Sequence, residues 1–326
     1  MSSEKILVIG ANGQLGTALT VALQEKYGTS NVIASDINTP LRSVIGIFEK
    51  LDVLDINRLR AVVQKYGVTQ IYHLAAILSA KGEQNPQGTW DINMQGLWNV
   101  LEVSREEKLN RVYFPSSIAA FGPQTPKENT PQYTVMHPTT IYGITKQAGE
   151  QLAEYYFRRY GVDVRSLRYP GIISYETLPG GGTTDYAVDI YFKAAQGEDY
   201  ECFLSEETRL PMIYMPDAIR ATLELMDAPK ENINVRYSYN LQGMSFTPIE
   251  LAREIQKFVP DFKVTYKPDA RQEIADSWIN SMDDSAARKD WGWKPSFDIT
   301  TMTEDMLKNL AKRFGRGSEY NEMKYL

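Results

Sequence analysis

Two residues spaced one helical turn apart could exchange a proton with an alcohol. Tyr142 and Lys146 stand four positions apart in Tyr142-Gly143-Ile144-Thr145-Lys146, so a helix would place them on one face. A free phenol has a pKa of about 10, and a nearby ammonium group favours its ionised form, which can accept the proton of a substrate hydroxyl. Ser117, which follows the strand-like segment 111–115, could polarise the same oxygen. These three residues are the candidate catalytic group.

The turn after the first apolar segment is rich in glycine. Gly10, Gly13 and Gly16 lie between a strand-like segment (5–9) and a helix-like one. Such a turn lets backbone N–H groups and the start of a helix approach a pyrophosphate. Asp36 follows Gly16 by 20 residues, the separation at which a carboxylate binds the adenosine ribose of NAD and repels the 2′-phosphate of NADP. We therefore expect NAD as the cofactor, bound also by the remaining polar and apolar residues of the turn, Asn12, Gln14 and Leu15.

Strand-like and helix-like segments alternate up to about residue 173, which is typical of a parallel sheet covered by helices. The expected strands are 5–9, 31–35, 47–50, 70–73, 111–115 and 163–168, and the expected helices are 15–23, 56–65, 86–101 and 140–160. This pattern predicts an α/β fold with a doubly wound parallel sheet. We assign 1–173 to a nucleotide-binding domain, to which 217–242 return, 174–314 to a smaller α/β substrate-binding region, and 315–326 to a polar tail.

Charge and the scarcest residue types exclude several classes of function. The 326 residues include 35 Lys+Arg and 41 Asp+Glu, a net charge of −6, whereas nucleic-acid binding depends on clustered cations. One cysteine (Cys202) and two histidines (His73 and His137) are too few and too dispersed for a zinc site. No apolar run approaches the roughly 18 residues of a membrane helix, and no signal segment is visible. We expect no metal, no nucleic acid, no membrane contact and a cytoplasmic location.

The motifs occur in a recognisable order. The glycine turn, Asp36, His73-Leu74-Ala75-Ala76, Ser117 and the Tyr142/Lys146 pair resemble the extended short-chain dehydrogenase/reductase family, and the likeness spans the chain. Residues 168–174, 180–187 and 209–215 are similar, within that family, to the short-chain type of L-threonine 3-dehydrogenases. The resemblance implies a Rossmann fold, a homodimer built on residues 90–101 and 142–160, and NAD-dependent oxidation of the 3-hydroxyl of L-threonine to 2-amino-3-oxobutanoate.

The resemblance also suggests roles for individual residues. Tyr142 would take the hydroxyl proton, Ser117 would hold the oxygen, and Lys146 would lower the phenol pKa and bind the nicotinamide ribose. Further cofactor contacts are expected from Asp52, Val53, Leu74, Ala75, Ala76, Asn93, Tyr169 and Ile172. Contacts to the amino acid are expected from Gly182, Thr183 and Thr184, from Asp185 as the ammonium partner, and from Ser79 as a carboxylate donor.

Simpler interpretations stand beside these roles. Asp52 could be a turn residue, and Asn93 could be a polar helix residue facing water. His73 is expected to be packed and hydrogen-bonded rather than catalytic, and Trp278 and Trp291 are expected to be core anchors.

The alternative function is an NAD-dependent sugar-nucleotide 4-epimerase or dehydratase. It is disfavoured because Lys193 is the only cation between residues 169 and 208, where a nucleoside diphosphate would need a second phosphate site.

Overall fold

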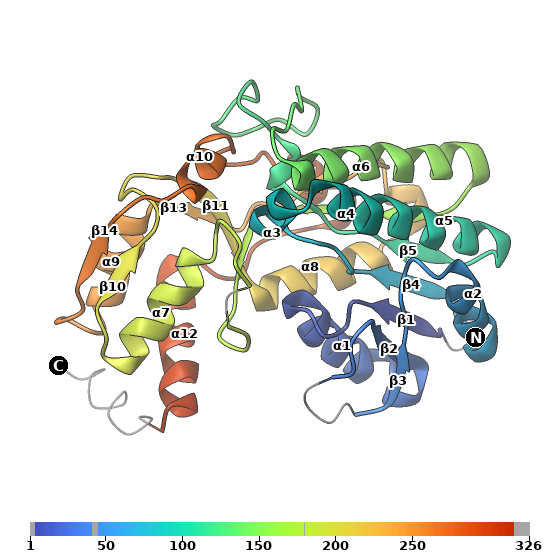
Figure 1. Ribbon diagram of the computed structural model, residues 1–326, viewed down its shortest axis with the longest axis horizontal. Coiled ribbons are helices and arrows are strands. Elements are labelled where there is room, and N and C mark those ends of the chain that lie inside the picture. The colour runs from blue at the N-terminus through green and yellow to red at the C-terminus, as the bar shows by residue number, and fades with distance from the viewer. Residues whose placement is uncertain (1–3, 41–44, 179, 316–326) are drawn as a thin grey trace.

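The computed structural model describes residues 4–40, 45–178 and 180–315, and Figure 1 shows a layered α/β part beside a smaller part built from later segments. The main sheet has six parallel strands in the order β3-β2-β1-β4-β5-β7. Their bounds are Ile47–Lys50, Val32–Asp36, Ile6–Ile9, Gln70–His73, Arg111–Tyr113 and Val164–Arg165. The strand order reverses between β1 and β4, and ligands of such sheets bind beyond the carboxyl ends of the strands at that point.

Helices cover both faces of this sheet, which explains why the strand β1 is buried at every position. On one face α1 (Gln14–Tyr27) packs beside α8 (Met215–Asp227). On the other lie α2 (Ile56–Tyr66), α5 (Gly96–Glu106) and α6 (Ile141–Tyr160), preceded by the short helices α3 (Ser79–Gln84) and α4 (Pro86–Trp90). The predicted doubly wound α/β fold is confirmed.

The later part of the chain forms smaller sheets with a core of their own. One sheet has the order β13-β11-β9 and the other pairs β10 with β14. Their bounds are Met244–Phe246, Leu210–Tyr214, Gly171–Ile173, Tyr200–Cys202 and Val264–Tyr266. The helices are α7 (Tyr186–Gln196), α9 (Pro248–Gln256), α10 (Arg271–Asp276), α11 (Ser285–Trp291) and α12 (Ile299–Arg313). Within 217–242, α8 packs on α1, and β12 (Tyr239–Asn240) pairs with β8 (Leu167–Tyr169).

Two expected elements differ in the structure. The predicted strand 163–168 is split, because β7 joins the main sheet whereas β8 lies in a separate sheet of order β12-β8-β6, where β6 is Ser116–Ser117. The predicted helix 86–101 contains a π-helical segment, Asp91–Gln95, between α4 and α5. Insertions of this kind rotate the following side chains and are frequent at functional sites. Of the expected tail, residues 316–326 lie outside the described residues, and no helix among those described is long and apolar enough to cross a membrane.

Candidate active site

The glycine turn has the close approaches that a phosphate cradle needs. Gly10 has a φ of +87°, and a Cβ there would lie 2.7 Å from the backbone nitrogen of Ala75. A Cβ on Gly16 would lie 2.1 Å from the Gly10 carbonyl oxygen, so only glycine lets α1 pack this close to β1. Gly13 is the N-cap of α1 and offers no side chain, so among the described residues the first backbone N–H groups of the helix have no side-chain cap. The residues present therefore fit a dinucleotide pyrophosphate.

Asp36 lies beside this turn, at the carboxyl end of β2. Its Oδ2 accepts a hydrogen bond from the backbone nitrogen of Asn12 (3.2 Å), and its Oδ1 accepts one from that of Asn38 (3.0 Å). The Asn12 side chain is itself fixed by the carbonyl of Asn38 at 2.8 Å. These bonds hold the carboxylate next to the phosphate cradle, the place where an adenosine ribose would follow the pyrophosphate.

The helix α6 carries the candidate catalytic pair. The side chain of Thr140 caps its first turn by accepting from the Gly143 backbone nitrogen, so Tyr142 and Lys146 lie within the first turns. Lys146 Nζ donates to the Pro115 carbonyl oxygen at 2.6 Å and lies 5.5 Å from the centroid of the Tyr142 ring. Ser117 follows directly after this anchored segment, and its Oγ accepts from the Ala119 backbone nitrogen at 3.1 Å.

Burial decides the protonation of this pair. It raises the pKa of Tyr142 to about 12, against a smaller lowering by the Ser117 hydroxyl. It also lowers the pKa of Lys146 to about 7, opposed by the Glu150 carboxylate. The role expected of Lys146, lowering the phenol pKa, stays a prediction: in this structure its ammonium binds the Pro115 carbonyl, and burial has the largest effect on the phenol.

One pocket joins the glycine turn to the candidate catalytic group. The expected site residues that line it are Gly10, Gly13, Gln14, Leu15, Gly16, Leu74, Ala76, Ser79, Ser117, Tyr142, Lys146, Tyr169, Ile172, Gly182, Thr183, Thr184 and Asp185. These come from segments that are far apart in the sequence, and they meet where the main strands and β8 end, beside β6 and the start of β9.

The segment 182–185 forms another part of the pocket wall. Asp185 Oδ2 accepts from the backbone nitrogens of Gly181 and Gly182, both at 2.7 Å. Burial raises the pKa of Asp185, although hydrogen bonds from the backbone of Gly182, Gly181 and Gly180 act against it. Thr183 is buried, and its hydroxyl has no hydrogen-bond partner among the described residues. The Thr183 hydroxyl therefore retains unused hydrogen-bonding capacity at the pocket.

Other expected residues stand outside the pocket lining. Asn93, in the π-helical segment, bonds to the backbone nitrogen and oxygen of Ile77 and to the Thr145 hydroxyl, so it ties the segment after β4 to α6. Asp52 Oδ1 accepts from the Leu54 nitrogen at 2.9 Å, as a turn residue does. Asn12, Asp36, Val53 and Ala75 also lie outside that lining.

His73, at the end of β4, was expected to be packed and hydrogen-bonded. It is buried and stacks on Phe114, but its Nδ1 has no partner among the described residues. Burial and the nearby Lys146 charge lower the pKa of His73 to about 3, so the imidazole is neutral.

The pocket also contains residues that the sequence did not single out for it: Leu78, Pro115, Ser116, Ile118, Pro170, Gly171 and Trp278. Trp278 was expected only in the core, yet it lines the pocket although it is just 5% exposed. The Pro115 and Ser116 positions could have been inferred from their place beside Ser117. No local pattern marks Trp278, whose place in the pocket depends on the packing of α10.

Known proteins are similar to this chain in sequence and in fold. The model of the NAD dependent epimerase/dehydratase family matches residues 6–241. The mitochondrial L-threonine 3-dehydrogenase of Bos taurus is 48% identical over 307 residues, which cover 93% of this chain and 82% of that protein. The holo structure of a GalE-like L-threonine dehydrogenase from Cupriavidus necator has a TM-score of 0.93 and 56% identity, covering 94% of this chain and 99% of that one.

A third similar protein is described as a monomeric L-threonine 3-dehydrogenase from a metagenome. Its apo structure has a TM-score of 0.92 and 52% identity, with coverage of 94% of this chain and 99% of that one. The family match spans more than half of the chain, and the identities hold over nearly all of it. The chain therefore belongs to the NAD-dependent epimerase/dehydratase family, as an extended short-chain dehydrogenase/reductase of the kind that includes the L-threonine 3-dehydrogenases.

Proposed function

We propose that this protein oxidises the 3-hydroxyl of L-threonine with NAD as the hydride acceptor, giving 2-amino-3-oxobutanoate. The observation that carries the proposal is the composition of the single pocket that joins the glycine turn to Tyr142. Of the described residues that line it, Lys146 is the only cation, and it stands beside the candidate base. A sugar nucleotide would need further cations for its diphosphate, whereas a small amino acid needs neutral donors and one acid. The similar proteins named as threonine dehydrogenases support the same substrate.

The chain's own residues divide the work as follows. The Tyr142 phenolate takes the proton of the threonine hydroxyl, and Ser117 holds the same oxygen as the C3–O bond becomes a carbonyl. Lys146 binds the nicotinamide ribose and favours the phenolate. A bound oxidised nicotinamide would supply the acceptor for the hydride that leaves C3. Burial raises the pKa of Tyr142, so the phenolate needs a positive charge nearby, which Lys146 would supply.

The amino-acid end of the substrate would lie against the segment 182–185. The Asp185 carboxylate would accept from the ammonium group, while Ser79 and the Thr183 and Thr184 hydroxyls would donate to the substrate carboxylate. Asp36 beside the glycine turn favours NAD over NADP, because a carboxylate at this place repels a 2′-phosphate.

One assay separates this function from a sugar-nucleotide 4-epimerase or dehydratase. NADH absorbance is followed with L-threonine and NAD, and product formation is followed in parallel with UDP- and dTDP-sugars. Threonine-dependent NADH formation with no turnover of the nucleotides is expected. Conversion of a sugar nucleotide without threonine oxidation would reject the proposal.

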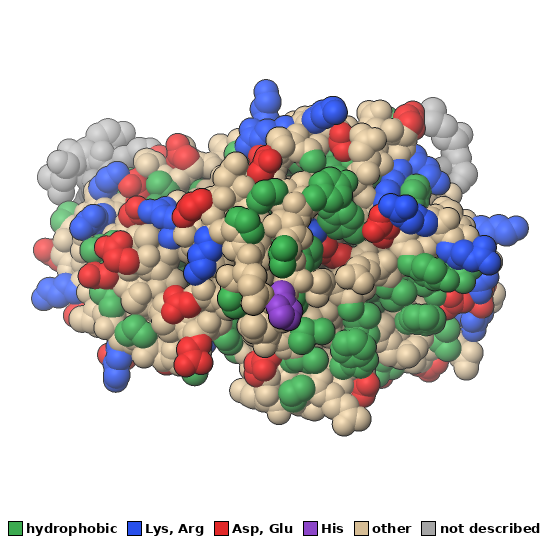
Figure 2. Space-filling view, turned by 90° about the horizontal axis from the view of Figure 1, so that it is seen from above, with side chains coloured by type: hydrophobic (Ala, Val, Ile, Leu, Met, Phe, Trp, Pro, Cys, Tyr) green, Lys and Arg blue, Asp and Glu red, His purple; other side chains and the backbone are tan. Residues whose placement is uncertain are grey.

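We also propose a homodimer built on α4, α5 and α6. Trp90, Trp98 and Tyr155 are between 43% and 50% exposed and line a shallow groove with Met94 and Leu152. Figure 2, which looks onto this side of the molecule, shows hydrophobic side chains grouped over the helices. Exposed aromatic groups of this size are typical of interfaces.

Light scattering tests the association directly. A dimeric mass that becomes monomeric in Trp98→Glu is expected. A monomeric mass for the unaltered protein at working concentration would reject the dimer. The similar protein from a metagenome is described as monomeric, so this outcome has a precedent.

A further inference from the structure

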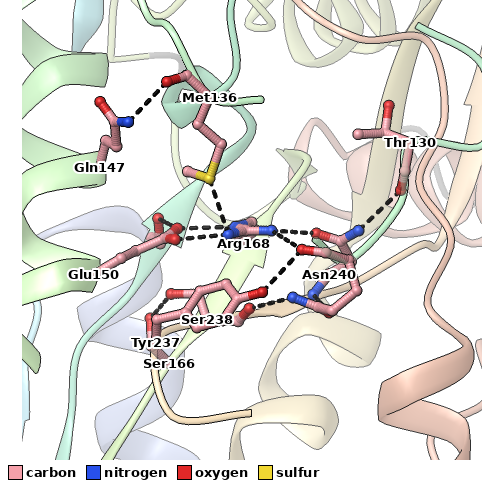
Figure 3. Close-up of polar contacts among 11 residues, drawn as sticks. Thr130, Met136, Gln147, Glu150, Ser166, Arg168, Tyr237, Ser238 and Asn240 are labelled. Carbon is pink, nitrogen blue, oxygen red and sulfur yellow. Dashed lines mark hydrogen bonds and ion pairs between the residues drawn. The ribbon is translucent and has the colours of Figure 1, made fainter. Parts of the chain in front are cut away.

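A buried ion pair lies behind the candidate catalytic helix. Arg168 on β8 is fully buried, and Glu150 on α6 is 2% exposed. The guanidinium donates to both carboxylate oxygens, with Nε–Oε1 at 2.9 Å and Nη2–Oε2 at 2.7 Å. Figure 3 shows Arg168 between Glu150 on one side and Asn240 on the other. Glu150 is one helical turn after Lys146 and two after Tyr142, so all three lie along the same side of α6.

The rest of the guanidinium is fixed as well. It bonds to the Gln132 carbonyl (3.1 Å), Asn240 Oδ1 (2.9 Å) and Met136 Sδ (3.1 Å), and it lies 5.0 Å from the ring centroids of Phe121 and Tyr237. A buried ion pair is by itself weak evidence for stability, because desolvation opposes the attraction of the charges. A pair held this firmly beside the active site therefore invites a functional explanation.

The pair reaches the active site through the strand β6. Ser116 Oγ donates to Glu150 Oε1 at 2.5 Å, and Lys146 Nζ holds the preceding carbonyl, that of Pro115. Two side chains one turn apart on α6 thus anchor Pro115, just before β6, and Ser116, its first residue. Ser117 comes next, and because side chains alternate along a strand it faces away from Ser116 and toward Tyr142. The register supports the arrangement, since Ser116 pairs with Arg168 across β6 and β8.

The same carboxylate acts on the charge of Lys146. Burial lowers the pKa of Lys146 to about 7, and Glu150 is the charge that raises it. His73, from β4, is neutral because its pKa is about 3. Other titratable groups on the elements around α6 are engaged elsewhere: Glu83 with the Ile141 nitrogen, Glu102 with Arg105 and Tyr156, Arg165 with Asp163, and Tyr169 with Tyr113 and Thr222. Asp185 is held by Gly181 and Gly182.

We propose that Glu150, held in place by Arg168, is a positioning residue of this active site: its carboxylate fixes Ser116 so that Ser117 faces Tyr142, and its negative charge favours the protonated form of Lys146. The inference rests on the proposed function for the role of Tyr142, but its electrostatic part concerns Lys146 and the cofactor alone.

The first test measures the dissociation constant of NADH against pH, by fluorescence and without threonine. Loss of the Lys146 proton is expected to weaken NADH binding at alkaline pH. Glu150→Gln leaves the Arg168 cation uncompensated and so lowers the pKa of Lys146. The pH at which binding weakens should therefore fall by about 1 unit. An unchanged midpoint in Glu150→Gln would overturn the electrostatic part.

Two further variants keep the test decisive if Glu150→Gln does not fold. Combining Glu150→Gln with Arg168→Met removes the cation that the single variant leaves without a counter-charge. Replacing both partners of a buried ion pair is tolerated better than removing one of them. The double variant should bring the midpoint back toward that of the unaltered protein; a midpoint that stays low would contradict the charge argument.

Ser116→Ala retains both charges and removes only the hydroxyl. It should leave the NADH midpoint in place and lower kcat for threonine about tenfold or more with little change in KM, because Ser117 loses its anchor. An unchanged kcat in Ser116→Ala would overturn the positioning part.

Asp163→Asn is the matched control, since it changes a carboxylate to an amide in another buried pair, that of Asp163 with Arg165. It should lower the melting temperature and leave the NADH midpoint unchanged; an equal shift there would show that the effect is general destabilisation. If the unaltered protein did not oxidise threonine, the proposed function would fail, while the pH dependence of NADH binding would still decide the electrostatic part.

Discussion

Replacing Thr183 by valine is expected to stabilise the free protein and to weaken the binding of threonine. The Thr183 side chain is 1% exposed, and its hydroxyl has no partner among the described residues. An unpaired buried hydroxyl costs about 1–3 kcal/mol. Valine has nearly the same shape and removes this cost. The melting temperature should rise by about 2 °C per kcal/mol, and so by about 2–6 °C.

The effect on the substrate has the opposite sign. Thr183 lies in the pocket wall, directly after three successive glycines that let the segment adjust when a ligand binds. If its hydroxyl then pairs with the amino acid, the lost hydrogen bond is worth about 0.5–1.5 kcal/mol. The KM for threonine should therefore rise about 2- to 13-fold, with the KM for NAD unchanged.

Thr20→Val provides the matched control. Thr20 lies on α1, is 7% exposed, and also has a buried hydroxyl without a partner among the described residues, but it does not line the pocket. Thermal denaturation followed by fluorescence and initial rates of NADH formation give both quantities. Thr20→Val should raise the melting temperature and leave both KM values unchanged. A Thr183→Val protein that is less stable, or that keeps its KM for threonine, would refute the reasoning.

Three further predictions concern the proposed roles. Tyr142→Phe should lower kcat by about 10²- to 10⁴-fold at an unchanged melting temperature, since it removes the base but keeps the ring, and near-normal turnover would remove Tyr142 from this role. Asp36→Ala should raise the KM for NAD by about 10- to 150-fold, which is the factor that corresponds to one hydrogen bond to a charged group, and it should improve the use of NADP. Steady-state rates with both cofactors check this, and an unaltered preference for NAD would contradict it. Asp185→Asn should raise the KM for threonine about tenfold or more while kcat changes less, because the ammonium loses its counter-charge, and a KM equal to that of the unaltered protein would exclude the ammonium contact.

The elements of the nucleotide-binding part could be read from the sequence with small errors at their ends. The strand expected at 31–35 is β2, Val32–Asp36, and the helix expected at 140–160 is α6, Ile141–Tyr160. These segments carry their own periodicity and caps, so local residues are sufficient to predict them. The predicted strand 163–168 was wrong because its structure depends on which other strands pair with it. The segment 163–168 has one apolar pattern, but β5 and β12 pair with different halves of it.

By itself the sequence determined which functional groups are present: a glycine turn before a helix, an acid 20 residues later, and a phenol and an ammonium one turn apart. Each of these depends on residues close together in the chain. The tertiary structure decided which groups act on one another. In it Trp278 lines the pocket, and the Lys146 ammonium donates to the Pro115 carbonyl. Glu150 forms an ion pair with Arg168 and accepts a hydrogen bond from Ser116. Burial, which governs the pKa values of Tyr142 and Lys146, results from the packing of the whole chain, and so no local pattern could reveal it.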